Sequence, residues 1–279
     1  MGNLGVRAKD GLPARRVGDW SGEKLLYIQK YLEIFSVSMR SRWPVRHYID
    51  LFSGPGKCVM EDGTGERLGS PLIALGLKHP FTGYHFVEKG AETLDALKIR
   101  VETQYKGLSG RVVYYLGDAN EQVDRICRNL PSNSLNVVLV DPTGLHLKYS
   151  ALSRLVGGRK ADLIYLFPEG MSIKRNEGTM NRQDNSLLDD VMGDRRWRDW
   201  KWPKVSYFRN RLKSLGYVDF NPSDIMGEVT MRNRKGVMLY YLVFAAKHPR
   251  AVKFWNSIHV GRQMELGFKR REGEARGRT

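Results

Sequence analysis

Apolar residues recur along this chain with two spacings that alternate. Short runs rich in β-branched, aromatic and leucine residues predict five strands, at 48–50, 83–88, 112–118, 135–141 and 161–168. Apolar positions three or four residues apart predict helices between them, as at 91–105 and 149–156. Strands that alternate with helices indicate an open, mostly parallel α/β sheet.

The last part of the pattern differs from the first. Residues 217–230 and 236–246 read as two strands, and the turn-like residues 232–236 between them predict an antiparallel hairpin. Five crossed-over strands and a terminal hairpin are typical of the Rossmann-like class I S-adenosylmethionine (SAM) methyltransferase fold. We therefore predict an α/β protein with a mostly parallel seven-stranded sheet.

One domain, from residue 18 to 258, accommodates this pattern. It opens with a helix over 18–40 that packs beside the first strand, where Ser21 and Lys24 form half of a capping box. It contains an inserted basic, aromatic helical segment at 171–213. We expect a flexible basic arm at 1–17 and a disordered charged tail at 259–279.

Acidic residues stand at the ends of four predicted strands: Asp50, Glu88, Asp118 and Asp141. The carboxyl ends of parallel strands meet at one edge of the sheet, which is where open α/β sheets bind ligands. Glu88 suits the hydroxyls of a ribose, and Asp118 suits the exocyclic amine of an adenine. The acids therefore predict a nucleoside-type ligand.

A glycine-rich turn, Phe52-Ser53-Gly54-Pro55-Gly56, follows the first strand, and its glycines let the backbone approach a ligand. The turn is not a P-loop, because Leu51 and Cys58 occupy positions where that motif needs Gly and Ser or Thr. We predict that SAM binds to residues from all these elements: Asp50, Phe52, Ser53, Gly54, Pro55, Gly56, Glu88, Lys89, Asp118, Ala119 and Asp141.

The fourth strand ends in Asp141-Pro142-Thr143-Gly144, which partly resembles the Asp-Pro-Pro-aromatic motif of amino methyltransferases. There the acid and the proline carbonyl accept from the target amine, and an aromatic residue stacks on the base. His146 is a possible substitute for the aromatic ring, so we predict that Asp141, Pro142 and His146 are catalytic. An alternative set, Asp141 with Lys174 and Glu228, would suit methylation of a ribose hydroxyl. Without a Pro-Cys pair here, methylation of a pyrimidine carbon is disfavoured.

The net charge of the chain bears on the identity of the methyl acceptor. Lys and Arg number 46 against 30 Asp and Glu, a formal charge of +16, which favours a nucleic acid partner although many basic proteins bind none. Candidate phosphate contacts lie in the long loop 54–69 and in the insertion: Lys57, Arg67, Lys174, Arg175, Arg182, Arg195 and Arg196. The i, i+3 spacing of Trp197 and Trp200 favours packing over base stacking.

Composition also excludes several classes. Two cysteines argue against a disulfide scaffold and fit a reducing cytoplasm, and the six histidines show no metal-ligand spacing, so we predict no metal and rank a nuclease low. No apolar run approaches the length of a membrane span, and the basic N-terminus lacks the apolar core of a signal peptide.

Several motifs together resemble the three-Cys-motif partner proteins (TcmP). They are 50–56, Gly-Ser-Pro-Leu at 69–72, Phe-Val-Glu-Lys at 86–89, 140–144, 240–249 and 254–255. The resemblance implies a methyltransferase-like fold, a SAM pocket and a separate radical-SAM-like protein with three cysteines as partner. It also implies an aromatic residue where Thr143 stands. Two alternatives stay open: a methyltransferase of a peptide or small molecule, and a non-catalytic subunit that positions the partner.

Overall fold

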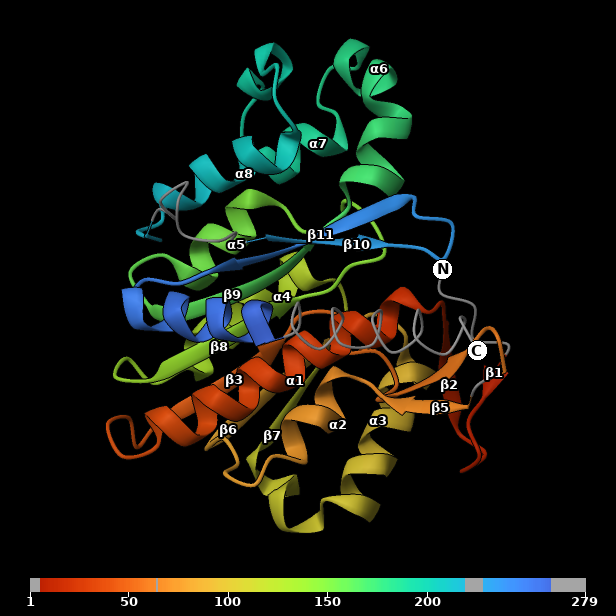
Figure 1. Cartoon of the computed structure of the whole chain (residues 1–279). Helices are drawn as coiled ribbons and strands as arrows, with labels where there is room; N and C mark the ends of the chain where they lie inside the picture. Colours follow the sequence, from red (N-terminus) through yellow and green to blue (C-terminus); the bar gives the residue numbers. More distant parts are fainter. Residues whose placement is uncertain (1–5, 64, 219–227, 262–279) are drawn as a thin grey trace, which may run out of the picture.

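The computed structural model describes residues 6–63, 65–218 and 228–261, and a seven-stranded sheet forms its centre (Figure 1). The strand order is β10-β11-β9-β8-β3-β6-β7. β11 runs antiparallel to both β9 and β10, whereas the other neighbours pair in parallel. This order and the terminal hairpin confirm the predicted class I fold. The strands are β3 (Arg46–Asp50), β6 (Gly83–Glu88), β7 (Val112–Leu116), β8 (Leu135–Val140), β9 (Lys160–Phe167), β10 (Glu228–Arg232) and β11 (Met238–Ala245).

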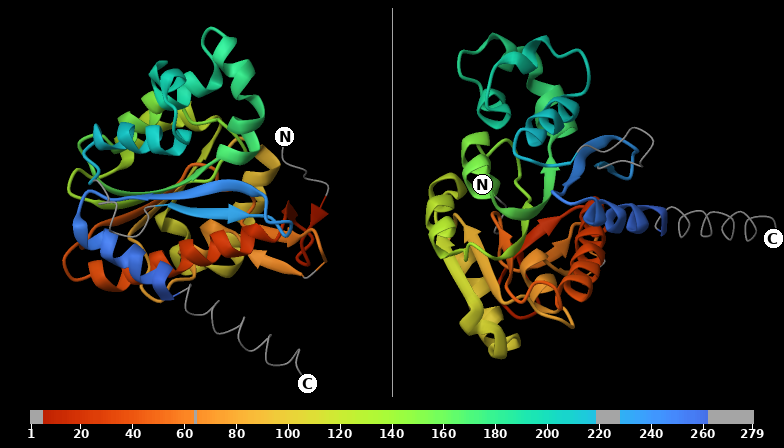
Figure 2. Two further views of the ribbon diagram at one scale, coloured as in Figure 1. Left: turned by 45° about the horizontal axis from the view of Figure 1, so that its top comes forward. Right: turned by 90° about the vertical axis from the view of Figure 1, so that its left-hand side faces the viewer.

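Helices cover both faces of the sheet, as Figure 2 shows from two further sides. Along β8, Val137 and Leu139 join the core on one face, and Val138 and Val140 join the core on the other. The first face packs against α1 (Trp20–Met39), α2 (Ser70–Leu75), α3 (Ala91–Gln104) and the helical residues 249–261. The second packs against α4 (Ala119–Asn129), α5 (Tyr149–Val156), α7 (Leu187–Met192) and α8 (Lys204–Lys213).

The inserted segment lies at the top of Figure 1 and is helical throughout most of its length. It comprises η2 (Glu169–Ile173), α6 (Lys174–Arg182), α7, η3 (Arg196–Asp199) and α8. Trp197 is fully buried, and its indole nitrogen donates to Asp189 Oδ1 at 2.8 Å. Packing was therefore the right interpretation for Trp197, whereas Trp202 is 70% exposed.

A second, smaller sheet lies beside the main one, in the order β1-β2-β4-β5. Its strands are β1 (Val6–Arg7), β2 (Pro13–Val17), β4 (Lys57–Met60) and β5 (Glu66–Leu68). The prediction of a flexible arm over 1–17 is thus wrong for residues 6–17, and residues 1–5 lie outside the described residues. The long loop 54–69 supplies β4 and β5.

A buried arginine explains why this N-terminal segment is ordered. Arg100 on α3 is fully buried and donates to both carboxylate oxygens of Asp10, at 2.8 and 2.9 Å. It also donates to the carbonyl oxygens of Pro13 and Pro55, at 2.8 and 2.6 Å, and so joins β2 to the glycine-rich turn. A buried guanidinium needs acceptors for its donors, and the segment supplies them.

Two other predicted boundaries differ from the structure. Tyr217 and Val218 are not in a strand, residues 219–227 lie outside the described residues, and β10 begins at Glu228. Residues 259–261 continue the last helix instead of starting a tail, and the predicted disorder of 262–279 falls outside the described residues. None of the helices in the described part of the chain is long and apolar enough to cross a membrane.

Candidate functional site

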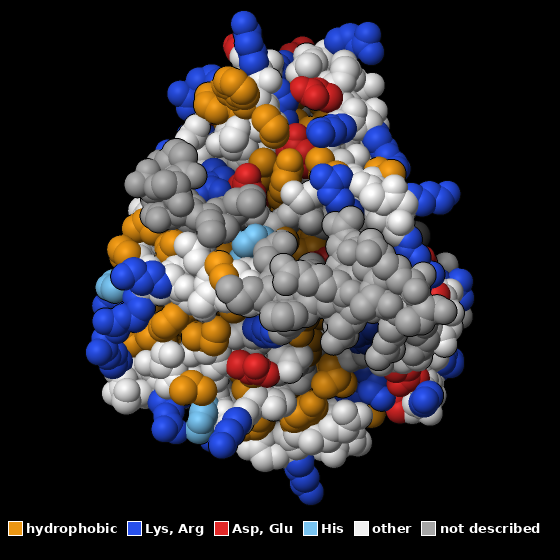
Figure 3. Space-filling view, viewed as in Figure 1, with side chains coloured by type: hydrophobic (Ala, Val, Ile, Leu, Met, Phe, Trp, Pro, Cys, Tyr) orange, Lys and Arg blue, Asp and Glu red, His pale blue; other side chains and the backbone are white. Residues whose placement is uncertain are grey.

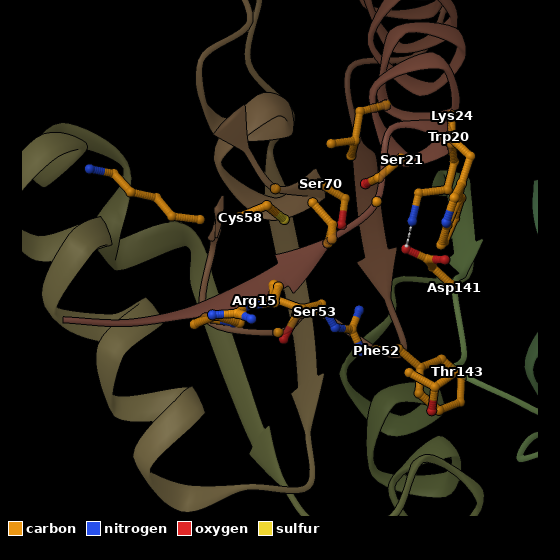
Figure 4. Close-up of a pocket in the computed structure, with 18 of the residues that line it drawn as sticks. Arg15, Trp20, Ser21, Lys24, Phe52, Ser53, Cys58, Ser70, Asp141 and Thr143 are labelled. Carbon is orange, nitrogen blue, oxygen red and sulfur yellow. Dashed lines mark hydrogen bonds and ion pairs between the residues drawn. The ribbon is translucent and has the colours of Figure 1, made fainter. Parts of the chain in front are cut away.

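Two cavities open at the carboxyl edge of the main sheet. The larger has a volume of about 500 Å³ and lies at the ends of β3, β6 and β7, and the smaller, of about 260 Å³, lies between the start of α1 and the end of β8. The two share five lining residues: Arg15, Phe52, Gly54, Pro55 and Thr143. Both therefore meet at the glycine-rich turn, and Figure 4 shows part of the smaller one.

The turn needs its glycines for two reasons. Gly54 and Gly56 have φ angles of 62° and 87°, in the left-handed region that L-residues with side chains rarely adopt. A Cβ on Gly56 would also lie 2.9 Å from Leu97 Cδ1. Ser53 anchors the turn to β6, since its amide donates to the carbonyl oxygen of Val87 at 2.9 Å.

Glu88 and Asp118, for which the sequence predicts contacts to a nucleoside, both line the larger cavity. Glu88 accepts from the backbone amides of Gly54 and Gly90, at 3.0 and 2.9 Å, so it also fixes the turn. Asp118 caps α4 by accepting from the amide of Asn120 at 3.0 Å. Burial raises the pKa of Asp118, but the hydrogen bonds from Asn120 and Lys89 outweigh burial and hold it below its usual value.

Three further predicted cofactor residues surround these acids. Lys89 lines the larger cavity but is largely exposed, and its ammonium lies 3.4 Å from Asp118 Oδ2. Ala119, at the start of α4, lines the same cavity, whereas Ser53 lines the smaller one. With Phe52, Gly54 and Pro55 shared by both, these positions fit the predicted ligand edge.

Asp50 has a different place from the one predicted. Its carboxylate is fully buried, lines neither cavity, and accepts from Ser70 Oγ at 2.6 Å, the Phe52 amide at 3.2 Å and the Tyr48 hydroxyl at 3.3 Å. Burial raises its pKa to about 6, although the hydrogen bond from Ser70 opposes that shift. Asp50 thus supports the turn from behind instead of lining the ligand space.

The smaller cavity contains a buried ion pair. Lys24 of α1 donates from Nζ to Oδ2 of Asp141, and their exposed fractions are only 5% and 7% (Figure 4). The ammonium also lies 5.1 Å from the centroid of the Trp20 ring. Pro142 lines the same cavity, along with Ser21, Cys58, Ser70 and Tyr240.

Lys24 and Arg15 are the main cations that the sequence analysis missed at this site. Lys24 lies on the buried side of α1 with Tyr27 and Ile28. A lysine on the apolar face of a predicted helix is the sequence feature that could have indicated a buried charge at this site. Arg15 belongs to the segment predicted to be a flexible arm, and nothing in its local sequence indicates a site.

The three predicted catalytic residues are divided between the cavities. Asp141 and Pro142 line the smaller one, whereas His146 lines the larger one, with its Nε2 3.3 Å from Thr143 Oγ1. Burial lowers the pKa of His146, which favours a neutral ring. The structure does not bring His146 and Asp141 into one cavity, so a shared acceptor site for these two residues is not supported.

The predicted phosphate contacts lie apart from the cavities, with one exception. Lys57 lines the smaller cavity but pairs with Asp10 at 2.9 Å and Glu66 at 3.6 Å. The others line neither: Arg67, Lys174, Arg175, Arg182, Arg195 and Arg196.

Within the insertion, some of these cations have acidic partners. Arg195 lies 3.3 Å from Asp184 and Arg196 lies 2.6 Å from Asp194, whereas Lys174, Arg175 and Arg182 are exposed. The alternative set for ribose methylation is not assembled either. Glu228 pairs with Arg209 at 2.8 Å, and neither Lys174 nor Glu228 lines a cavity. Across the residues that the structure describes, no cluster of His, Cys, Asp and Glu is placed to hold a metal ion.

No protein-family model and no curated protein matches this chain in sequence, so the resemblance to three-Cys-motif partner proteins stays a prediction. Solved structures do match. The protein LPL1258 from Legionella pneumophila has a TM-score of 0.50 and 9% identity, over 84% of this chain and 90% of that one. At this identity the likeness shows the fold alone.

Two other similar structures have lower scores. The O-methyltransferase from Bacillus cereus in complex with SAH has a TM-score of 0.42 and 12% identity, over 78% of this chain and 80% of that one. TYW2 from P. horikoshii in complex with MeSAdo has a TM-score of 0.42 and 15% identity, over 87% and 71%. Similarity at this level carries no information on activity. The strand order therefore defines the class I methyltransferase fold, and the site must indicate the function.

Proposed function

We propose that this protein is a SAM-dependent methyltransferase whose acceptor is a nucleic acid. The observation that supports it best is the pair of cavities that meet at the glycine-rich turn, on the carboxyl edge of a class I sheet. A methyltransferase needs one space for its cofactor and an adjoining one for the acceptor. The larger volume, about 500 Å³, is in the range of ligand sites.

The residues of the larger cavity fit the nucleoside part of the cofactor. Glu88 and Asp118 offer carboxylate oxygens for ribose hydroxyls and an adenine amine, and Leu51, Val87 and Ala119 supply apolar surface. When bound, the cofactor would supply a methyl group activated by a sulfonium. The residues of the protein would orient it and exclude water from the junction of the cavities.

We propose that Asp141 binds the methyl acceptor. Its Oδ2 accepts from Lys24, and its Oδ1 accepts from no described residue, so Oδ1 is open to a hydrogen bond from the acceptor. Lys24 pairs with the Asp141 carboxylate, and the centroid of the Trp20 ring lies 5.1 Å from the ammonium. An amine or hydroxyl hydrogen-bonded to Asp141 would keep its lone pair directed at the junction.

The nucleic acid part of the proposal rests on charge. The formal net charge is +16, and three exposed cations of α6 form no ion pair with a described residue: Lys174, Arg175 and Arg182. Figure 3 shows Lys and Arg side chains on the upper part of the molecule, where Figure 1 shows the insertion. They suit a backbone that approaches from the insertion. The proposed three-cysteine partner rests on the sequence resemblance, and co-purification of the two proteins tests it separately.

Calorimetric titration tests the cofactor first. SAM and S-adenosylhomocysteine should bind to the wild type with micromolar affinity, and Glu88→Gln should bind about 10-fold more weakly, because one carboxylate oxygen becomes an amide. Glu92→Gln is the matched control, since Glu92 is exposed on α3 and lines neither cavity. A folded wild type that binds neither compound would overturn the proposal.

Labelled SAM then tests the acceptor. RNA and DNA should accept the methyl group, and their binding should weaken steeply as salt rises from 50 to 200 mM, because bound phosphates release counterions. Methyl transfer to peptides but not to nucleic acids would contradict the proposed acceptor and leave the proposed cofactor unchanged. Cofactor binding without transfer to any acceptor would favour a non-catalytic subunit.

A further inference from the structure

The N-terminal strand β2 places an arginine at the junction of the two cavities. Arg15 lines both of them, is partly buried, and forms no hydrogen bond or ion pair with any described residue. Its neighbour Arg16 is exposed and lines only the smaller cavity. The lysines that line the cavities each have a carboxylate partner: Lys24, Lys57 and Lys89. A guanidinium left without an acceptor at a cavity wall indicates an anionic ligand group.

The backbone that carries Arg15 is held on both sides. Arg15 pairs with Cys58 across the parallel β2 and β4 strands, and the preceding Ala14 is fully buried. The carbonyl oxygen of Pro13 accepts from Arg100, which also binds the carbonyl oxygen of Pro55 in the glycine-rich turn. Arg15 and the turn are thus tied to one buried side chain, so the cation is positioned before any ligand arrives.

The acidic residues that line the two cavities disfavour a ligand carboxylate beside them. Glu88 and Asp118 in the larger cavity, and Glu61 and Asp141 in the smaller, would all repel it. In Figure 4, Arg15 and Ser53 lie on one side of the smaller cavity, and Lys24 and Asp141 lie on the other. An anionic group at the junction would therefore meet Arg15 without displacing an existing ion pair.

We infer that Arg15 binds the carboxylate of the amino-acid part of SAM. The inference rests on the proposed function, which assigns the nucleoside to the larger cavity. From there, the amino-acid chain must reach the shared wall, where the guanidinium can hold the carboxylate by paired hydrogen bonds. The segment 6–17 then belongs to the cofactor site, and Arg15 is one of its binding residues.

Two ligands that differ by one group test this. Decarboxylated SAM keeps the adenosine, sulfonium and amine of SAM and lacks only the carboxylate. Calorimetry on the wild type should show SAM binding about 10- to 100-fold more tightly than decarboxylated SAM. Arg15→Met should remove that preference by weakening SAM alone, and Arg15→Lys should restore part of it. Arg128→Met, an exposed arginine at the end of α4, is the matched control for net charge.

Each outcome is informative. An Arg15→Met protein that keeps the preference for SAM would overturn the inference, as would equal loss of affinity for both ligands, which would indicate a distorted cavity. A wild type that binds both ligands equally would also overturn it and leave the proposed cofactor intact. A wild type that binds neither would overturn the proposed function itself.

Discussion

Two buried cations, Arg100 and Lys24, stand in contrasting surroundings within the same part of the molecule. Arg100 donates five hydrogen bonds, two to the Asp10 carboxylate and the others to carbonyl oxygens of Leu12, Pro13 and Pro55. Lys24 makes one hydrogen bond to a described residue, Asp141, although an ammonium has three donors. All five hydrogen bonds of Arg100 go to residues of the protein, whereas Lys24 has donors left that can serve a ligand in the smaller cavity.

The difference separates a structural ion pair from a functional one. A saturated guanidinium gains nothing from a ligand, and its burial serves to hold segments together. An undersaturated ammonium beside a carboxylate, in a cavity that adjoins a nucleotide-type site, is costly to maintain for stability alone. The two pairs should therefore respond in opposite ways when their charges are removed.

The largest expected effect is on methyl transfer. The double variant Lys24→Met/Asp141→Asn should lose at least about 100-fold in single-turnover transfer from labelled SAM, because a neutral amide, which is a weaker hydrogen-bond acceptor, replaces the carboxylate that binds the methyl acceptor. Its free energy of unfolding in urea should stay within about 1 kcal/mol of the wild type, since no lone buried charge is left. Lys98→Met/Asp95→Asn removes an exposed pair on α3 and is the matched control. Full activity of Lys24→Met/Asp141→Asn would show that this ion pair has no role in methyl transfer.

The next effect is on stability. Arg100→Met should lower the free energy of unfolding by about 3–5 kcal/mol, because the carboxylate of Asp10 and the carbonyl oxygens of Pro13 and Pro55 lose their donor. Removing the second charge as well, in Arg100→Met/Asp10→Asn, should not restore stability, since the carbonyl oxygens stay unpaired. Urea unfolding measures both variants, with Arg128→Met as the exposed control. A double variant as stable as the wild type would show that the two pairs are alike.

The smallest effect is a pH dependence. The hydrogen bond from Arg100 outweighs burial and holds the pKa of Asp10 well below its usual value. The unfolded chain therefore binds this proton more readily, so the stabilisation is present above about pH 4 and is lost as the pH falls below that value. The stability difference between the wild type and Asp10→Asn should accordingly shrink between pH 5 and pH 2 in urea titrations. A difference that stays constant over this range would contradict the assignment.

Much of the central sheet could be predicted from sequence, because its strands are continuous apolar runs that end in acids. The expected bounds of 83–88 match β6, and those of 149–156 match α5. Glu88 and Asp118 fall at strand ends, and strand ends of a parallel sheet meet at one edge. For these elements, the local hydrophobic pattern is enough to predict both the element and its place in the sheet.

The features that the sequence did not predict depend on contacts between residues far apart in the chain. Strand β2 contains two arginines and no long apolar run, and it is ordered by Arg100, about which its own residues give no signal. Lys24, in the first turn of a predicted helix, gives no sign in its local sequence of its partner, Asp141, which is 117 positions away. The sequence predicts Asp50 in the ligand site, because an acid at a strand end has the same local sequence whether it faces a cavity or Ser70.

The excursion between Gly56 and Gly69 begins and ends at one hydrogen bond, from the Gly69 amide to the Gly56 carbonyl oxygen at 2.7 Å. A Cβ on Gly69 would lie 3.1 Å from that oxygen, so the two backbones touch. The excursion therefore leaves the ligand turn and returns to it at one point. Because its strand β4 pairs with β2, an exchange of the excursion would act on Arg15 through β2, while the closure at Gly56 and Gly69 stays in place.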